Sequence, residues 1–131
     1  DGVDFDVFNQ ENTPVLSDDI IRCLLVDRSG VLWISTRRGG IICYKNGGFE
    51  KSYTTKDGLL SNDVPAISQS HDGSLWIGTA NGVNRLESGK ISAVRFHGTA
   101  AASDIQTLVE DSSGHLWIGT TEGLFVAAGW G

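Results

Sequence analysis

Carboxylates and glycines recur together in this sequence in a pattern that could resemble fragments of cation-binding loops. Asp27 and Asp111 each begin an Asp-x-x-Gly stretch, and Asp72 directly precedes a glycine. Calcium takes about six to eight oxygen ligands, whereas each stretch offers one or two carboxylates and lacks a closing glutamate. We therefore expect tight turns instead of metal loops. Their glycines are Gly30, Gly73 and Gly114.

Histidines and cysteines add no recognisable reaction centre. No two histidines lie at the spacing of metal ligands, and none has a nucleophile suggested beside it. Cys23 and Cys43 fall in the first and third strands of one expected sheet, about 9–10 Å apart, which exceeds the ~7 Å reach of a disulfide. The sequence therefore predicts free thiols, with no catalytic residue, metal site or cofactor.

The turns belong to an internal repeat. Segments 27–36, 70–79 and 111–120 each contain a turn followed by Leu-Trp-Ile, Ser or Gly, and Thr. The tryptophans of successive segments are 43 and 41 residues apart. A ten-residue pattern that returns three times at nearly constant spacing indicates a repeat architecture.

Each repeat is expected to fold into short antiparallel strands. An apolar strand precedes each turn, at 21–26, 64–69 and 105–110, and the tryptophan strand follows the turn. A glycine-containing hairpin then leads to a third strand, at 41–45, 83–87 and 124–128. Fourth strands are expected at 49–53 and 91–96, and no window has helical periodicity of useful length. Four short strands per ~40–45 residues are typical of a β-propeller blade. The expected fold is all-β, with three four-stranded antiparallel blades.

The blades are expected at 19–53, 62–96 and 103–131, the last without an outer strand of its own. Residues 3–8 alternate as an outer strand would, and are assigned to an adjoining blade. Closed propellers have about four to eight blades, so three make a partial propeller. One hypothesis is that residues 3–8 complete the last blade of a neighbouring copy, giving a ring closed as a dimer or trimer. The alternative is that the remaining blades belong to a longer chain.

The tryptophans have two possible uses. Indole rings stack well on sugars, but Trp33, Trp76 and Trp117 lie mid-strand between Leu and Ile. Large apolar residues at consecutive positions predict a sheet covered on both faces. Burial between blades is therefore the favoured interpretation for all three indoles.

Composition excludes some partners. The net charge of −6 disfavours nucleic acid, because phosphate binding needs a positive patch. No run reaches the roughly eighteen apolar residues of a membrane helix, so no membrane insertion by this segment is expected, and no signal peptide is visible.

At this point the motifs resemble a known family. The lead-ins at 16–20 and 60–64, followed by Asp-x-x-Gly-x-Leu-Trp-Ile-Gly-Thr, resemble the two-component regulator propeller repeat. The first unit departs by having Ser35 for the glycine, and the third has Ala102-Ser103 in its lead-in. The resemblance implies the sensor region of bacterial membrane histidine kinases, hybrid kinases or diguanylate cyclases. It also implies a soluble periplasmic or other extracytoplasmic location, and carbohydrate ligands.

A binding site is expected at one end of the blades, where the hairpins between second and third strands meet the inter-blade links. These loops differ between repeats while the frame does not, and variable loops on a rigid scaffold are where specificity is expected. The candidate residues are Arg37, Arg38, Asn81 and Glu122 on the hairpins, and Asp19, Asp63 and Asp104 on the links.

These observations predict a non-catalytic module for ligand binding and signal input, with an oligosaccharide or another small molecule as ligand. A protein-interaction scaffold without a small ligand is the alternative. The Asp-Gly turns also resemble the Asp-box hairpins of sialidases, which makes a glycosidase fragment a third and less favoured interpretation. Glycosidases need two carboxylates in one pocket, whereas these carboxylates recur by repeat without a singular pair.

Overall fold

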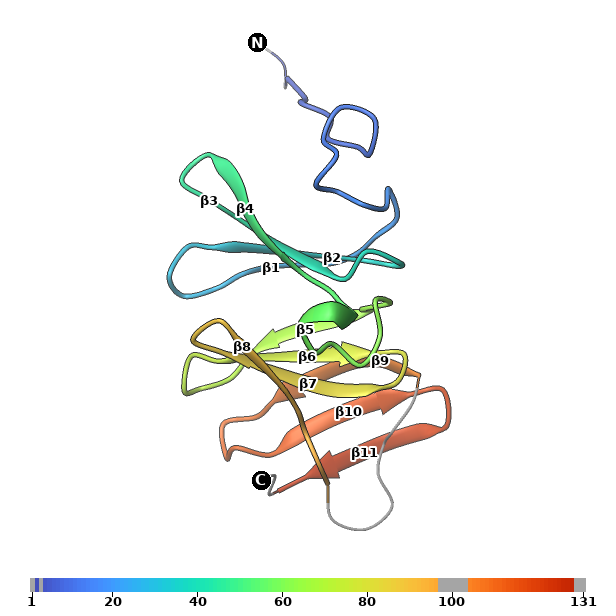
Figure 1. Ribbon diagram of the computed structural model, residues 1–131. Helices are drawn as coiled ribbons and strands as arrows, with labels where there is room; N and C mark the ends of the chain where they lie inside the picture. The colour runs from blue at the N-terminus through green and yellow to red at the C-terminus, as the bar shows by residue number, and fades with distance from the viewer. Residues whose placement is uncertain (1, 3, 97–103, 129–131) are drawn as a thin grey trace.

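The computed structural model describes residues 2, 4–96 and 104–128. Within them, three antiparallel sheets follow one another along the chain, in the strand orders β1-β2-β3-β4, β5-β6-β7-β8 and β11-β10-β9 (Figure 1). The strands are β1 (Ile21–Val26), β2 (Leu32–Thr36), β3 (Ile41–Lys45), β4 (Gly48–Tyr53), β5 (Ala66–Gln69), β6 (Leu75–Thr79), β7 (Gly82–Glu87), β8 (Lys90–Ala93), β9 (Ile105–Glu110), β10 (Leu116–Thr120) and β11 (Gly123–Ala127).

The sheets confirm the expected all-β propeller blades. Strand order within each sheet follows the chain, as hairpin-connected antiparallel strands must, and the third sheet has three strands in the described residues. The fourth strand of the second sheet is shorter than the predicted 91–96, because β8 ends at Ala93. A 3-10 turn, η1 (Thr55–Asp57), was not predicted from sequence; it is closed by a capping box on Thr54 and by Gly58 at φ 114°.

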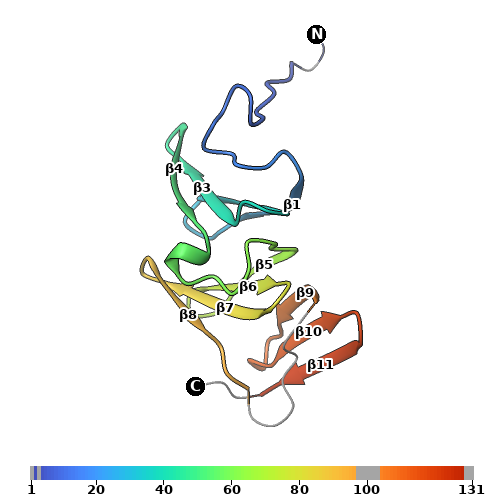
Figure 2. The same cartoon turned by 45° about the vertical axis from the view of Figure 1, so that its right-hand side comes forward.

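The three sheets are stacked face to face, with the inner strands β1, β5 and β9 next to one another (Figures 1 and 2). Apolar side chains fill the two junctions between successive sheets. The first junction contains Ile41, Tyr53, Leu59, Val64, Ile67, Leu75, Ile77 and Leu86. The second contains Ala66, Trp76, Val83, Ile105, Leu108, Leu116 and Ile118.

The three tryptophans differ in burial. Trp76 is fully buried in the second junction, and Trp33 packs against the first junction while half-buried. Trp117 is 37% exposed, so the expectation of a buried indole is wrong for this residue. The physical reason is its direction: each indole faces the following sheet, and no described sheet follows β9–β11.

The described part of the predicted segment 3–8 forms no strand. Residues 4–8 have no regular secondary structure, and they extend away from the first sheet (Figure 1). Phe8 makes an edge contact with Phe49 on β4, with ring centroids 5.4 Å apart. A strand needs a partner edge to pair with, and none is reached within one chain; pairing with another copy stays a prediction.

The turns after the first strand of each sheet match their sequence signature. Gly30, Gly73 and Gly114 have φ of 87°, 94° and 85°, a left-handed conformation that favours glycine. Strand β2 lies between the strands that carry Cys23 and Cys43, and both cysteines are free thiols. In the described residues, no helix is long and apolar enough to cross a membrane.

Candidate functional site

The inter-blade links meet the hairpins at one end of the inner strands, and we call this end the rim. Backbone hydrogen bonds fix it: the N–H of Arg37 donates to the carbonyl of Ile20 over 3.0 Å, and that of Ala80 to the carbonyl of Asp63 over 3.1 Å. The same hairpin position therefore meets the same link position in the first two blades. The repeated strands, hairpins and links therefore form the rim in the same way in both blades.

Ala80 joins the links of the second and third blades. Its N–H reaches Asp63, and its carbonyl accepts from the N–H of Asp104 over 2.8 Å. The carboxylate of Asp104 in turn accepts from Thr121 Oγ1 on the next hairpin, over 3.4 Å. Two of the predicted link carboxylates are thus brought to the same edge of neighbouring blades.

Arg22 is a rim residue that the sequence patterns did not identify. It lies at the start of β1, and its Nε is 3.5 Å from Asp63 Oδ1 in an ion pair between the first and second blades. Both side chains are about one-third exposed. That carboxylate oxygen is buried and makes no hydrogen bond with described residues. The only sequence signal was an arginine inside an otherwise apolar strand.

Asp19 lies one residue away from the position that Asp63 occupies. The hairpin of the first blade bonds the carbonyl of Ile20 instead, because its lead-in has one additional residue before the tryptophan. Asp19 Oδ1 accepts from the N–H of Gln10 over 2.6 Å. The neighbouring Asp18 is buried, and its Oδ2 has no hydrogen-bond partner among the described residues.

The hairpin tips carry the remaining predicted residues. Arg38, Asn81 and Glu122 are exposed, and Arg37 is partly buried. The Asn81 side chain is not free for a ligand alone, since its Nδ2 donates to the carbonyl of Leu60 over 3.2 Å. The backbone N–H of Glu122 donates to Thr120 Oγ1 over 3.0 Å.

The rim combines guanidinium donors with carboxylate and carbonyl acceptors. That set can bind hydroxyl groups and small polar molecules through several hydrogen bonds at once. Among the residues that the structure describes, no group of three or more His, Cys, Asp or Glu side chains could hold a metal ion.

The turn carboxylates have structural tasks. Asp27 Oδ2 and Asp111 Oδ2 accept from the indole N–H of Trp33 and Trp117, over 2.9 and 2.8 Å. Burial raises the pKa of Asp27, but the indole and backbone N–H groups outweigh it and lower this pKa below its usual value. The indole of Trp117 lowers the pKa of Asp111 in the same way. The general acid of a glycosidase needs a raised pKa, so these two carboxylates do not suit that role.

Comparison with known families agrees with this geometry. The model of the two component regulator propeller matches residues 15–38, 58–81 and 101–122, which contain the lead-in and tryptophan strand of each blade. The chain belongs to the two component regulator propeller family. The matched segments include the predicted rim residues Asp19, Asp63 and Asp104 on the links, and Arg37, Arg38, Asn81 and Glu122 on the hairpins.

Solved structures share the fold of this regulator propeller. The extracellular domain of BT3049, a protein described as a hybrid two component system of B. thetaiotaomicron, aligns with a TM-score of 0.79 and 22% identity over 93% of the chain. A catalytically inactive virginiamycin B lyase from Staphylococcus aureus, solved with quinupristin, aligns with a TM-score of 0.61 and 16% identity over 81% of the chain. At these identities the likeness concerns the fold.

The regulator propeller spans 17% of the length of the BT3049 domain and 40% of the length of the lyase. No curated protein matches the sequence.

Proposed function

We propose that the rim binds a small polyhydroxylated ligand, of the oligosaccharide class, as the input of a two component regulator. The observation that carries the proposal is the Arg22–Asp63 pair, which bridges two blades and leaves a buried carboxylate oxygen without a hydrogen bond. A ligand hydroxyl that donates to this oxygen would satisfy it. The large majority of buried polar groups in proteins have a hydrogen-bond partner, either protein or ordered water, so this oxygen lacks its usual partner.

The position of the pair supports a signalling role. A ligand that bonds Asp63 and the neighbouring Asp104 contacts links of two blades that already share Ala80. Ligand binding would therefore stabilise one orientation of a blade relative to the next. The extracellular domain of BT3049 has the same fold, which supports an extracytoplasmic location for this rim.

A thermal-shift screen against neutral and acidic oligosaccharides tests the proposal. A ligand that binds only the folded chain raises the melting temperature with its concentration. We expect at least one oligosaccharide to do so, and we expect Asp63→Asn and Arg22→Ala to weaken its binding by roughly tenfold or more. The first removes the charge of the proposed acceptor, and the second removes the cation that pairs with it.

The ion pair of Lys45 and Glu50 offers matched controls. It joins the strands β3 and β4 at 3.9 Å, and both side chains are about half exposed. Lys45→Ala and Glu50→Gln should leave oligosaccharide binding unchanged. A screen without any shift, or equal losses in the rim and control variants, would contradict ligand binding at the rim and favour a protein-interaction scaffold.

A further inference from the structure

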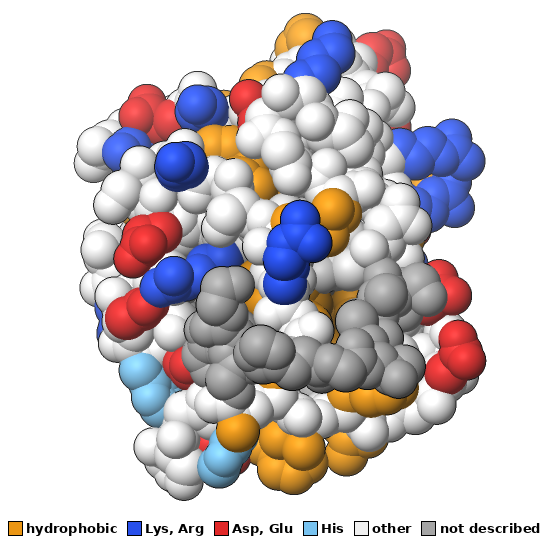
Figure 3. Space-filling model, turned by 60° about the horizontal axis from the view of Figure 1, so that its bottom comes forward, with side chains coloured by type: hydrophobic (Ala, Val, Ile, Leu, Met, Phe, Trp, Pro, Cys, Tyr) orange, Lys and Arg blue, Asp and Glu red, His pale blue; other side chains and the backbone are white. Residues whose placement is uncertain are grey.

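Apolar packing alone does not specify which sheet follows which in this chain. The buried residues of both junctions are mostly Ile, Leu and Val. Leu24 on the first inner strand and Trp117 and Val126 on the third sheet are exposed and equally apolar. Hydrophobic side chains are also visible at the end of the molecule where the third sheet lies (Figure 3). Repeat proteins misassemble when similar units pair in the wrong order, so a polar contact that differs between junctions would distinguish the correct order.

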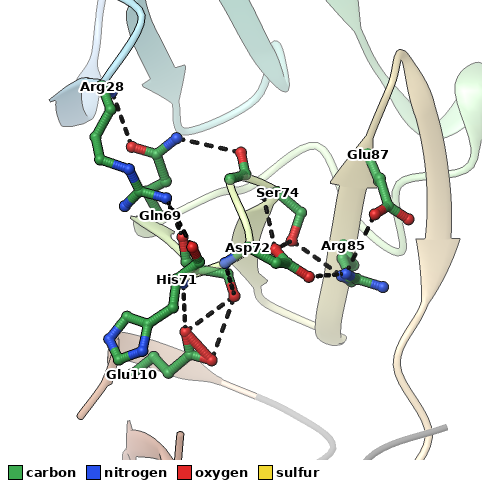
Figure 4. A network of polar contacts seen from close by, with 10 residues as sticks. Arg28, Gln69, His71, Asp72, Ser74, Arg85, Glu87 and Glu110 are labelled. Atoms are coloured by element: carbon green, nitrogen blue, oxygen red, sulfur yellow. Dashed lines mark hydrogen bonds and ion pairs between the residues drawn. The ribbon is translucent and has the colours of Figure 1, made fainter. Parts of the chain in front are cut away.

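Such a contact lies at the turns that follow the inner strands, at the opposite end of these strands from the rim. In the first junction, the backbone N–H of Arg28 donates to Gln69 Oε1 over 2.9 Å. In the second, the backbone N–H of His71 donates to Glu110 Oε1 over 2.7 Å (Figure 4). Both acceptors are the last residue of an inner strand. The two junctions therefore share a backbone donor, but one uses a neutral carboxamide and the other a carboxylate.

Ser70 explains why a carboxylate suits the second junction. Its hydroxyl donates to Glu110 Oε1 over 2.9 Å, beside the bond from the N–H of His71. Ser70 is 3% exposed, so this contact is largely removed from water. Hydrogen bonds to an ionised acceptor are stronger than those between neutral groups. The turn of the second blade thus offers two donors to one carboxylate.

Arg28 adds a cation from the first blade on the other side of the same peptide group. Its Nη2 donates to the carbonyl of Ser70 over 2.9 Å and to that of His71 over 3.1 Å. The peptide group between Ser70 and His71 therefore has a guanidinium at its oxygen and the Glu110 carboxylate at its N–H. Both charges polarise this group in the same direction, and hydrogen bonds in such a chain strengthen one another.

The turn of the first blade lacks this complementarity to a carboxylate. Asp27 occupies the position of Ser70, and its carboxylate accepts from the indole N–H of Trp33. An ionised carboxylate has no proton to donate. The residue opposite this turn is Gln69, whose Nε2 donates to the carbonyl of Gly73 over 3.1 Å. A neutral side chain therefore meets the turn that begins with aspartate, and an acidic one meets the turn that begins with serine.

We infer that Ser70 and Glu110 form a matched pair that specifies the third sheet as the one that follows the second. An aspartate in place of Ser70 would put a like charge beside Glu110. The same repulsion would arise if the third inner strand packed behind the first blade, because Glu110 would then lie beside Asp27. The pair therefore favours the native order of the blades over an order that apolar contacts alone would tolerate.

Urea unfolding of the whole chain at about pH 7 tests the pair. Ser70→Asp recreates the mismatch of Asp27 with Glu110 inside the second junction. Ser70→Asp with Glu110→Gln recreates the combination of Asp27 with Gln69 that the first junction uses. Ser70→Asn is the matched control, because asparagine has the size of aspartate, carries no charge and keeps a donor.

With Glu110 present, we expect the unfolding constant of Ser70→Asp to exceed that of Ser70→Asn by roughly tenfold or more. Glu110→Gln should reduce this ratio by roughly threefold or more. Part of the ratio should remain, because the N–H of Asp72 also contacts Ser70 and its carboxylate is close by. Glu110→Gln should therefore stabilise the Ser70→Asp chain, although it should raise the unfolding constant of the native chain roughly three- to tenfold.

Equal unfolding constants for Ser70→Asp and Ser70→Asn would overturn the proposal, as would a ratio that Glu110→Gln leaves unchanged. If neither of these Ser70 variants folds, Ser70→Ala decides the question. Glu110→Gln should then raise the unfolding constant by less than about twofold in the Ser70→Ala chain, because the hydroxyl donor is already absent. An effect as large as in the native chain would contradict the pairing. Neither residue of the pair belongs to the rim, so the outcome is independent of ligand binding there.

Discussion

At the scale of single residues, the turn of the second blade has different polar contacts from the turns of the other two blades. In the first and third blades an aspartate at the first turn position holds the indole, whereas Ser70 occupies that position in the second. Asp72 accepts from Ser74 over 2.6 Å and pairs with Arg85, whose guanidinium lies 5.9 Å from the ring of Trp76 (Figure 4). A repeat can thus change its polar chemistry while the strand positions stay fixed.

The pH dependence of stability should report on this turn. The Ser74 hydroxyl, its backbone N–H and the Arg85 charge lower the pKa of Asp72 from 3.8 to about 2. A carboxylate whose pKa is lower in the folded chain than in the unfolded chain stabilises the fold at pH values above its unfolded pKa. This stabilisation is lost as the pH falls towards the folded pKa. Urea unfolding of the native chain and Asp72→Asn should therefore differ at about pH 5 and converge near pH 2. The gap is about 1 kcal/mol after allowance for solvent screening.

Ser74→Ala provides the control, since it removes the largest cause of the lowered pKa. Its stability gap to the double variant with Asp72→Asn should be smaller at every pH. A gap between the native chain and Asp72→Asn that stays constant down to pH 2 would contradict the assignment of the low pKa to Asp72.

Residue roles were only partly predictable from sequence. Turn glycines could be read from their spacing because backbone conformation is local. The contacts between blades could not be predicted from their spacing, because no single repeat contains both partners. These contacts involve Arg22, Gln69 and Glu110. The lead-in motif aligns Asp19 with Asp63, but the first lead-in has one additional residue before the tryptophan. The carbonyl of Ile20, and not that of Asp19, therefore accepts the hairpin hydrogen bond that Asp63 accepts in the second blade.

At the scale of elements, close packing between blades explains the glycine in the Leu-Trp-Ile-Gly-Thr strand of the second blade. Gly78 lies where β6 meets the inner strand of the third blade, and an added Cβ would meet Ile105 and Leu108. In the first blade Ser35 takes the place of Gly78 and is fully buried. The first two junctions therefore differ in how closely the following inner strand approaches.

Gly78→Ala should destabilise the chain by about 1–3 kcal/mol through overpacking. Gly48→Ala is a suitable control, because β4 leaves open space around its added Cβ and φ is not left-handed there. The control should be neutral or slightly stabilising. The free energy of unfolding by urea measures both, and equal values for the two variants would mean that the second junction can widen without cost.

Element boundaries were largely predictable because the repeat supplies three versions of each strand. The bounds of β1, β3 and β9 agree with the residues expected from the apolar pattern. The inner strand expected at 64–69 begins at Ala66, and the larger exceptions are outer positions: β8 ends at Ala93, and residues 4–8 form no strand. Outer strands depend on a partner edge, and alternation of side chains alone does not supply one.

At the scale of the whole molecule, the described residues form a stack of three sheets with two junctions between them. Stability in such an array is approximately a sum of blade and nearest-neighbour terms. The same residue type should therefore contribute unequally along the chain. Trp76 fills a junction, while Trp117 is 37% exposed on the outer face of the third sheet, where its indole N–H donates to Asp111.

Tryptophan truncation should reveal this inequality. In dilute solution, Trp76→Ala should cost about 3–5 kcal/mol, as expected for a large buried side chain, and Trp117→Ala about 1 kcal/mol. The second cost should rise with protein concentration if another molecule covers the outer face of the third sheet, because association stabilises only chains that keep the apolar surface. Equal costs of the two variants at all concentrations would mean that this outer face is covered within one chain. A small cost for Trp76→Ala would show that the indole does not hold the second and third blades together.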